Sequence, residues 1–428
     1  MNRDGIMVDF YQHLGTFELH MPSRVIFGIG TVERVGPEAE DMNAHRALIV
    51  TDAGLAKAGL ASKVREPLLK SGLRVEVWDQ VEPEPSVRCV ENLLEHVGED
   101  DFDLLVGVGG GSSMDVAKSA AALLTNVGHP EDYFAGGKKE FANPGVPCIA
   151  VPTTSGTGAE ITCDAVIKDR TGMKAFYEHQ YICPTLAIVD PIMSSGMPPR
   201  LTAASGVDAL CHAIESSLTR NANPITMALA LQAIRLISSN LRFATHRGTN
   251  LEARYNMALA ALTAAFSEKN AGDVEAHAIG HLIGSVYGIP HGIACGIALP
   301  YAMEFNIGVS ADTLKLIAGA MGEDVRGSTD REAAYKGTYV VRQLIEDVGL
   351  PTTLKEIGVE KEEIPKLAED MTTNPWIRVF FDDYTIREMT EETALHLLQN
   401  TWEGKLGEPL KGTLSGGRPR RERAPLRK

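Results

Sequence analysis

Histidines and one aspartate in the second half of the chain have the types and spacing of metal ligands. Asp208 and His212 are four residues apart, which places them on one face of a helix. His277 and His281 repeat that spacing, and His291 follows between a proline and a glycine. The three later histidines stand among alanine, glycine and isoleucine, and a buried imidazole needs a partner. A divalent metal would satisfy several nitrogens and a carboxylate together, although either pair alone is more typical of a helical contact or a core histidine.

A glycine-rich loop in the first half could hold a diphosphate. Residues 106–115 read V-G-V-G-G-G-S-S-M-D and join a predicted strand to a predicted helix. Glycines let the backbone approach a ligand closely, and the start of the helix offers free N–H groups and a positive dipole end. A tight turn without a ligand is the alternative, and the strand-to-helix placement favours the phosphate loop.

Two further segments follow predicted strands. Residues 151–158 read V-P-T-T-S-G-T-G, a loop of hydroxyls and glycines suited to phosphate or ribose. Asp52 ends an earlier strand, where a carboxylate can accept a hydrogen bond from a ribose 2′-hydroxyl and repel a 2′-phosphate. Asp52 therefore favours NAD over NADP, unless it only caps a helix. The ends of parallel strands meet at one sheet edge, where ligands bind in open α/β folds.

The elements that must position these residues fall into two kinds. Predicted strands over 46–51, 74–78, 102–108 and 147–151 alternate with predicted helices over 60–70, 86–97 and 113–124, which indicates a parallel sheet with helices on both faces. After the pair Pro198-Pro199, helical patterns dominate, over 204–218, 224–240, 251–267 and 331–348. The sequence therefore predicts an α/β dinucleotide-binding domain over 1–198 and a helical metal-binding catalytic domain over 199–407. A basic tail over 408–428 reads as a disordered extension.

Composition excludes several classes of protein. The chain has 428 residues, 44% apolar and 23% charged, as in ordinary globular proteins. A net charge of −15 makes nucleic acid a poor partner. Six scattered cysteines without a C-x-x-C motif argue against a disulfide scaffold or a thiolate zinc site and favour a reduced compartment. No apolar stretch approaches 18 residues and no signal peptide is visible, so we expect a cytoplasmic protein with no membrane contact.

Taken in order, these residues resemble the iron-containing (group III) alcohol dehydrogenase family, a relative of glycerol dehydrogenase and dehydroquinate synthase. The resemblance spans residues 20–405. Its motifs are F-G-I-G-T from residue 27, G-G-G-S-S-M-D-V-A-K from 109, V-P-T-T-S-G-T-G-A-E from 151, A-I-V-D-P from 187, G-V-D-A-L-C-H-A-I-E from 206, and H-A-I-G-H from 277 with the later P-H-G.

The resemblance implies an α/β N-terminal dinucleotide-binding domain plus an all-α C-terminal domain, with the active site in the cleft between them. It implies hydride transfer between a small alcohol and NAD(H), giving an aldehyde or ketone, and a homo-oligomer. Fe(II) is the implied ion, and Zn(II) would bind the same nitrogens. The implied metal ligands are Asp208, His212, His277 and His291, and the implied catalytic residue near the nicotinamide is His281. The implied cofactor contacts are Asp52, Gly109, Gly110, Gly111, Ser112, Asp115, Thr153, Thr154, Thr157 and Lys174.

One departure leaves the subfamily open. Residues 271–277 read A-G-D-V-E-A-H, two residues longer between glycine and histidine than in many members. This resembles the hydroxyacid–oxoacid transhydrogenase branch, although that branch tends to carry tyrosine in place of His281. A metal-free reductase of the same fold is a second alternative. A lyase of the dehydroquinate synthase type, which would carry glutamate in place of Asp208, and a non-enzymatic scaffold are disfavoured. The segment 374–384, with Arg378, could line a substrate pocket or pack in the core.

Overall fold

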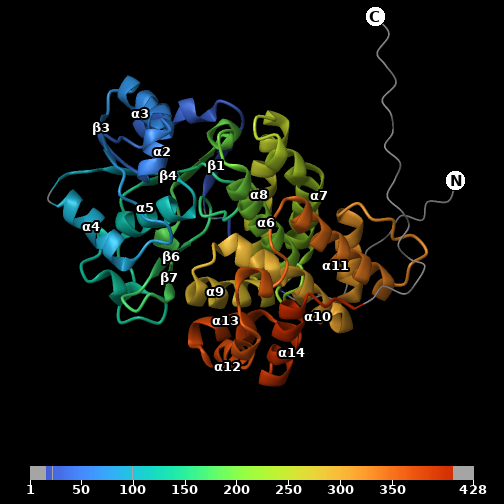
Figure 1. Ribbon diagram of the computed structural model, residues 1–428. Coiled ribbons are helices and arrows are strands. Elements are labelled where there is room, and N and C mark those ends of the chain that lie inside the picture. The colour runs from blue at the N-terminus through green and yellow to red at the C-terminus, as the bar shows by residue number, and fades with distance from the viewer. Residues whose placement is uncertain (1–15, 22, 99, 408–428) are drawn as a thin grey trace, which may run out of the picture.

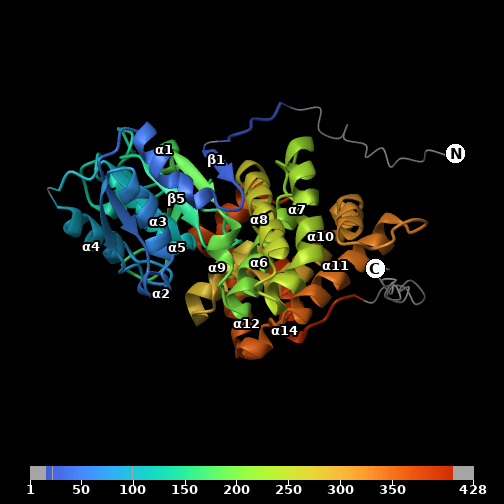
Figure 2. The same ribbon diagram turned by 90° about the horizontal axis from the view of Figure 1, so that it is seen from above.

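The computed structural model describes residues 16–21, 23–98 and 100–407. The chain forms an α/β part and a helical part that lie side by side (Figure 1). The last strand ends at Val189 and the first long helix of the helical part begins at Pro199. Figure 2, seen from above, shows helix α6 between the α/β part and helix α11. The tail predicted over 408–428 lies outside the described residues.

The α/β part is built on a six-stranded parallel sheet in the order β1-β8-β5-β4-β2-β3. Its strands are nearly continuous apolar runs because helices cover both faces. Strands β6 and β7 form a separate antiparallel hairpin. The strands are β1 (Arg24–Phe27), β2 (Arg46–Val50), β3 (Arg74–Trp78), β4 (Leu104–Gly109), β5 (Cys148–Pro152), β6 (Asp164–Lys168), β7 (Lys174–Glu178) and β8 (Leu186–Val189).

The described helices of this part are α1 (Val35–Asp41), α2 (Ala53–Lys57), α3 (Leu60–Lys70), α4 (Val87–Val97) and α5 (Gly111–Leu123). Helices α4 and α5 share one buried cluster with the sheet, and α1 and α3 share another. The side chain of Ser86 caps α4 by accepting from the Cys89 N–H at 3.3 Å, which explains the sharp start of that helix.

The helical part holds α6 (Pro199–Glu215), α7 (Pro224–His246), α8 (Leu251–Ala271), α9 (Glu275–Tyr287), α10 (His291–Ala320), α11 (Asp330–Asp347), α12 (Ile364–Thr373), α13 (Pro375–Tyr384) and α14 (Glu391–Glu403). Short 3₁₀ helices are η2 (Thr31–Arg34), η3 (Pro130–Tyr133), η4 (Gln180–Ile182), η5 (Pro191–Ser194), η6 (Lys355–Ile357) and η7 (Lys361–Glu363). Helix α10 is long and apolar enough to cross a membrane by length and composition alone, but 83% of its apolar window is buried inside the protein. It is the central core helix.

The four strands predicted from the sequence are found within two residues of their expected bounds, and helix α3 matches its range. Two strands of the sheet, β1 and β8, were not among those expected. Both are four residues long, too short for a clear periodic signal. Helix α6 spans 199–215 rather than 204–218 because Pro199 occupies its first turn, where the missing proline N–H costs nothing.

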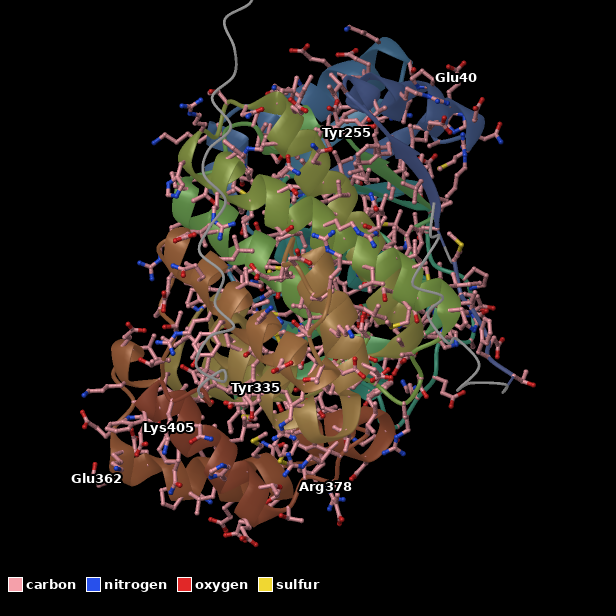
Figure 3. The ribbon with its side chains drawn as sticks, turned by 90° about the vertical axis from the view of Figure 1, so that its right-hand side faces the viewer. Glu40, Tyr255, Tyr335, Glu362, Arg378 and Lys405 are labelled. Atoms are coloured by element: carbon pink, nitrogen blue, oxygen red, sulfur yellow. A yellow bond between two sulfur atoms is a disulfide. The ribbon has the colours of Figure 1, made fainter. Side chains whose placement is uncertain are left out.

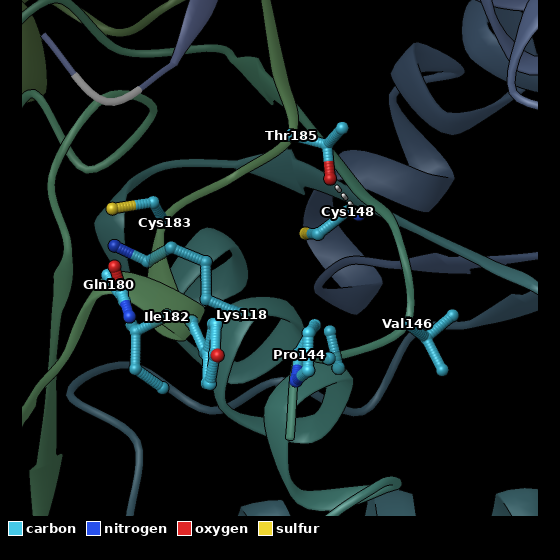
Figure 4. Close-up of a pocket in the computed structure, with 11 residues that line it drawn as sticks. Lys118, Pro144, Val146, Cys148, Gln180, Ile182, Cys183 and Thr185 are labelled. Atoms are coloured by element: carbon cyan, nitrogen blue, oxygen red, sulfur yellow. Dashed lines mark hydrogen bonds between the residues drawn. The ribbon is translucent and has the colours of Figure 1, made fainter. Parts of the chain in front are cut away.

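The sequence argues against a disulfide scaffold, and the structure holds a single disulfide bond. Cys163, just before β6, is bonded to Cys183, just before β8, while the other four cysteines are free and buried. The fold brings the pair together because the hairpin returns the chain toward η4. Cys183 lines a small pocket with Lys118 and Cys148, where the Cys148 N–H donates to Thr185 Oγ1 at 3.2 Å (Figure 4).

Candidate functional site

Helix α6 presents three functional side chains along one buried face. Asp208, His212 and Glu215 follow one another at spacings of four and three residues, so they stack along the helix. Their exposed fractions are 2%, 6% and 0%. Because charged and polar groups are costly to bury alone, each needs a partner from another helix.

The first turn of α10 reaches α6 because residue 292 is glycine. A Cβ atom at Gly292 would lie 2.2 Å from the carbonyl oxygen of Ala204 and 3.0 Å from Cβ of Asp208. With no side chain there, the two helices come close, and His291 Nε2 lies 3.8 Å from Asp208 Oδ1. The proline–histidine–glycine motif thus delivers an imidazole to the aspartate of α6.

Glu215 holds the start of helix α9. Its carboxylate accepts hydrogen bonds from the Ala276 N–H at 2.6 Å and the His277 N–H at 3.1 Å, two donors that the first turn of a helix leaves free. The same carboxylate contacts His277 Nδ1 at 2.5 Å. This contact occupies one ring nitrogen of His277 and leaves Nε2 free to face the cluster.

Four imidazoles gather where α6, α9 and α10 meet. The rings of His212 and His277 stack with centroids 4.7 Å apart, and His291 lies 5.4 Å from His277. Asp208, His277 and His291 form a mutually close group, and His212 forms a second group with Asp273 that shares His277. Asp208 Oδ1, His212 Nδ1 and His277 Nε2 are buried and find no hydrogen-bond partner among the described residues. Buried nitrogen and oxygen atoms that lack a hydrogen-bond partner are suitable ligands for a divalent ion.

The electrostatic environment shifts the pKa values of the imidazoles in different directions. Burial lowers the pKa of His212, and it lowers that of His291 well below the usual range with help from Lys174. At His277, burial also acts to lower the pKa, but the carboxylates of Asp273 and Glu215 outweigh it and raise the value to about 10. A metal ligand must be neutral, so an ion at this site would displace a proton from His277.

His281 lies beside this cluster. Its ring is 5.0 Å from His291 and 5.1 Å from Phe380 of α13. Burial, Lys174 and His277 lower the pKa of His281 well below its usual value. This shift keeps His281 neutral, able to donate a hydrogen bond from one ring nitrogen and accept one at the other.

The glycine loop lies at the carboxyl edge of β4, next to the end of β5. Gly109 pairs with Pro152 in the sheet, and its carbonyl oxygen accepts from the Thr153 N–H at 2.8 Å. Thr154 and Thr157 lie against the next two glycines, with Ser112 in the first turn of α5. The two loops predicted from the sequence therefore form one surface of glycines and hydroxyls.

Three other predicted cofactor contacts are engaged within the protein. Asp52 caps α2 by accepting from the Leu55 N–H at 3.0 Å, so the capping role is real. Asp115 pairs with Lys118 at 3.0 Å and accepts from the Val166 N–H at 3.1 Å. Lys174 is buried at the start of β7, 3.1 Å from a carboxylate oxygen of Glu84.

Two buried residues near the site had no role predicted from the sequence, and one candidate pocket residue lies outside the site. Glu215 was part of a recognised motif but had no assigned role, although its position three residues after His212 is a signal for the same helix face. Lys118, with 1% exposure, bonds the carbonyl oxygens of Ala159 and Asp164. Arg378 lies at the outer surface of α13, paired with Asp382 at 2.8 Å, and does not line the site (Figure 3).

A dinucleotide-type sheet edge beside a buried cluster of imidazoles and carboxylates defines an oxidoreductase of the alcohol dehydrogenase class. The sequence matches the family described as iron-containing alcohol dehydrogenase over residues 22–191, and the C-terminal region of the same family over residues 202–402. The chain belongs to the iron-containing alcohol dehydrogenase family.

Individual relatives agree with this assignment. Long-chain-alcohol dehydrogenase 1 of Geobacillus thermodenitrificans is 36% identical over 355 residues, covering 81% of this chain and 90% of the relative. A crystal structure of 1,3-propanediol oxidoreductase superimposes with a TM-score of 0.86 at 33% identity, covering 91% of this chain and 100% of the other. The crystal structure of sulfoacetaldehyde reductase from Bifidobacterium kashiwanohense in complex with NAD⁺ superimposes with a TM-score of 0.81 at 28% identity. The match covers 90% of this chain and 99% of the other. The shared activity is the interconversion of alcohols and aldehydes.

Proposed function

We propose that Asp208, His212, His277 and His291 hold a divalent ion, with Fe(II) as the expected metal and Zn(II) as the alternative. The observation that carries this proposal is the set of orphaned atoms. Three of these four side chains bury a nitrogen or oxygen that has no hydrogen-bond partner within the described part of the chain, and these atoms come from α6 and α9. Family membership supports the same ion.

We propose NAD(H) as the redox cofactor, bound along the carboxyl edge of β2, β4 and β5. Its contacts would be Gly109, Gly110, Gly111, Ser112, Thr153, Thr154 and Thr157, with Asp52, Asp115 and Lys174 as further contacts. Asp52 would select NAD through its free carboxylate oxygen, since only Oδ1 is used by the helix cap. Asp52→Ser keeps a capping oxygen and removes the charge, so it should raise the affinity for NADPH relative to NADH. An unchanged ratio of the two dissociation constants would remove Asp52 from cofactor selection.

The chain's own residues would bind and orient the reactants and exchange the proton. A bound divalent ion supplies Lewis-acid polarisation of an alcohol oxygen. The glycine loop and its hydroxyls would hold the cofactor at the sheet edge, opposite the buried cluster. Glu215 would keep His277 in one orientation. His281, held neutral, would accept or donate a proton in a hydrogen bond to the substrate oxygen. Phe380, against the His281 ring, would keep water from that side.

The proposal extends to the domains, the partners and the cellular location of the protein. We propose a dinucleotide-binding domain over 1–198 and a catalytic helical domain over 199–407. The physiological partner would be a small alcohol or aldehyde, and neither nucleic acid nor a membrane. A homo-oligomer in the cytoplasm is the expected form. The two family matches, which end at 191 and resume at 202, support the division.

The testing experiment is elemental analysis of protein purified without oxygen from cells supplied with Fe²⁺, combined with NADH fluorescence titration. One bound metal per chain that a chelator removes, and saturable NADH binding, are expected. A panel of alcohols and aldehydes with NAD(H) would then identify the substrate. Protein that binds NADH and reduces aldehydes without metal would instead be a metal-free reductase.

A further inference from the structure

A buried thiol lies against the histidine cluster. Cys295 is one helical turn after His291 in α10 and has no exposed surface. Its Sγ atom lies 3.7 Å from each of the two ring nitrogens of His291. The sulfur therefore contacts the imidazole ring of His291, which we assign to the metal site.

The sulfur also belongs to a mutually close set of donors. One ligand atom each from Asp208, His277, His291 and Cys295 lies within 4.8 Å of the others. In two residues of this set, which are 2% and 1% exposed, Asp208 Oδ1 and His277 Nε2 have no hydrogen-bond partner in the part of the chain that the structure describes. Two unsatisfied atoms from different helices thus face the same small region as the thiol. Among the described residues, His212 joins only the second group, with Asp273 and His277.

The packing of α9 against α10 leaves room for this sulfur. A Cβ atom at Gly280 would lie 2.3 Å from Cys295 Sγ and 3.1 Å from the Cys295 main-chain nitrogen. Any larger residue at position 280 would displace the sulfur or separate the helices. The glycine keeps Sγ beside the cluster, between the helices that carry His277 and His291.

We propose that Cys295 is a sulfur donor to the ion bound by Asp208, His277 and His291. This inference rests on the proposed metal site and names a competitor of His212 for its fourth ligand position. On binding, the thiol would lose its proton to solvent as a sulfur–metal bond forms. A thiolate is a soft ligand. A ligand set that includes one suits Zn(II) and Co(II) better than a set of nitrogen and oxygen atoms alone. The chain thus holds two competing fourth donors, the His212 imidazole and the Cys295 sulfur, and the sulfur biases the site toward zinc.

The test is X-ray absorption at the zinc edge on the full chain loaded with one equivalent of Zn(II). We expect a sulfur scatterer at about 2.3 Å in addition to nitrogen and oxygen at about 2.0–2.1 Å. Cys295→Ser should lose the sulfur scatterer. Cys89→Ser, which alters a buried free cysteine in α4, should retain it. The Co(II) form offers a second readout, a near-ultraviolet thiolate-to-cobalt absorption band that only Cys295→Ser removes.

The possible failures are distinct. Bound zinc with nitrogen and oxygen scatterers alone in the unmodified protein would overturn the role of Cys295 and leave the proposed metal site intact. A sulfur scatterer that persists in Cys295→Ser would also overturn it. Failure to bind zinc or cobalt would overturn the metal site and the sulfur ligand together. The X-ray absorption measurement on the unmodified chain tests whether sulfur binds the ion even if the serine variant does not fold.

Discussion

The two halves of the candidate site are built in different ways. In the α/β half, the ligand surface consists largely of main chain: glycines and short hydroxyl side chains at the ends of neighbouring strands β4 and β5. In the helical half, it consists of side-chain atoms from α6, α9 and α10, held by a buried carboxylate. A main-chain site tolerates many substitutions that preserve backbone geometry. A side-chain site depends on each atom and on the packing that aims it.

The largest effect should come from removing a ligand in the helical half. His277→Ala or His291→Ala should abolish metal retention, because each removes one nitrogen from a small donor set. NADH affinity, set in the other half, should stay unchanged. Elemental analysis and NADH fluorescence titration check the two statements. The control is His45→Ala, an imidazole with 81% side-chain exposure. Full metal content in either variant would refute the ligand assignment.

Loss of the supporting carboxylate should have a smaller effect. Glu215→Gln should weaken metal affinity by about 10–100-fold, because Glu215 orients His277 and anchors the start of α9. Competition with a chromogenic chelator measures the change. Glu275→Gln is the matched control, a buried carboxylate next in sequence to Ala276 that bonds Asn306 at 2.9 Å instead of a histidine. Equal metal affinity in the two variants would show that Glu215 has only a structural role.

Alanine substitutions at two adjacent glycines should separate the effect of main-chain geometry on stability from the effect of ligand contact on binding. Gly109 has φ +157°, and a Cβ there would lie 2.4 Å from Ser113 Oγ, so Gly109→Ala should destabilise the protein by about 1–3 kcal/mol. At Gly110 the nearest atom, on Thr154, is 3.4 Å away, and Gly110→Ala should leave the melting temperature unchanged. Both should weaken NADH binding and keep the metal. A stable Gly109→Ala variant with normal NADH affinity would contradict the main-chain site.

The smallest effect concerns pH. Burial raises the pKa of Glu160, just after the hydroxyl loop, from 4.5 to about 7. Between these values the folded protein keeps the proton and the unfolded chain has lost it, so stability falls as pH rises from about 4.5 to about 7. Glu160→Gln removes this dependence, and its stability relative to the unmodified protein should rise by about 1–3 kcal/mol between pH 5 and pH 7.5. Urea unfolding at the two pH values checks this. Parallel behaviour of the two proteins would refute it.

Much of the α/β half could be predicted from the sequence because its signals are local. The strand runs, the Ser86 cap and the glycine loop each depend on residues close together in the chain. Asp115 marks the limit of this reasoning. It sits in the predicted phosphate motif, but its carboxylate is used by Lys118 and by the Val166 N–H of a strand 51 residues away.

Local sequence signals are enough to predict the alternation of strands and helices, the glycine loop, and the placement of Asp208 and His212 on one helix face. These depend on backbone propensity and helical spacing, which neighbours in the chain set. Which side chains meet across elements depends instead on how the helices and strands pack. Glu215 reaches His277 across 62 residues, and Gly292 lets His291 approach Asp208. The Cys163–Cys183 bond and the place of Cys295 in the cluster likewise arise from how helices and the hairpin pack. Such contacts depend on shape complementarity between distant segments, which no local pattern encodes.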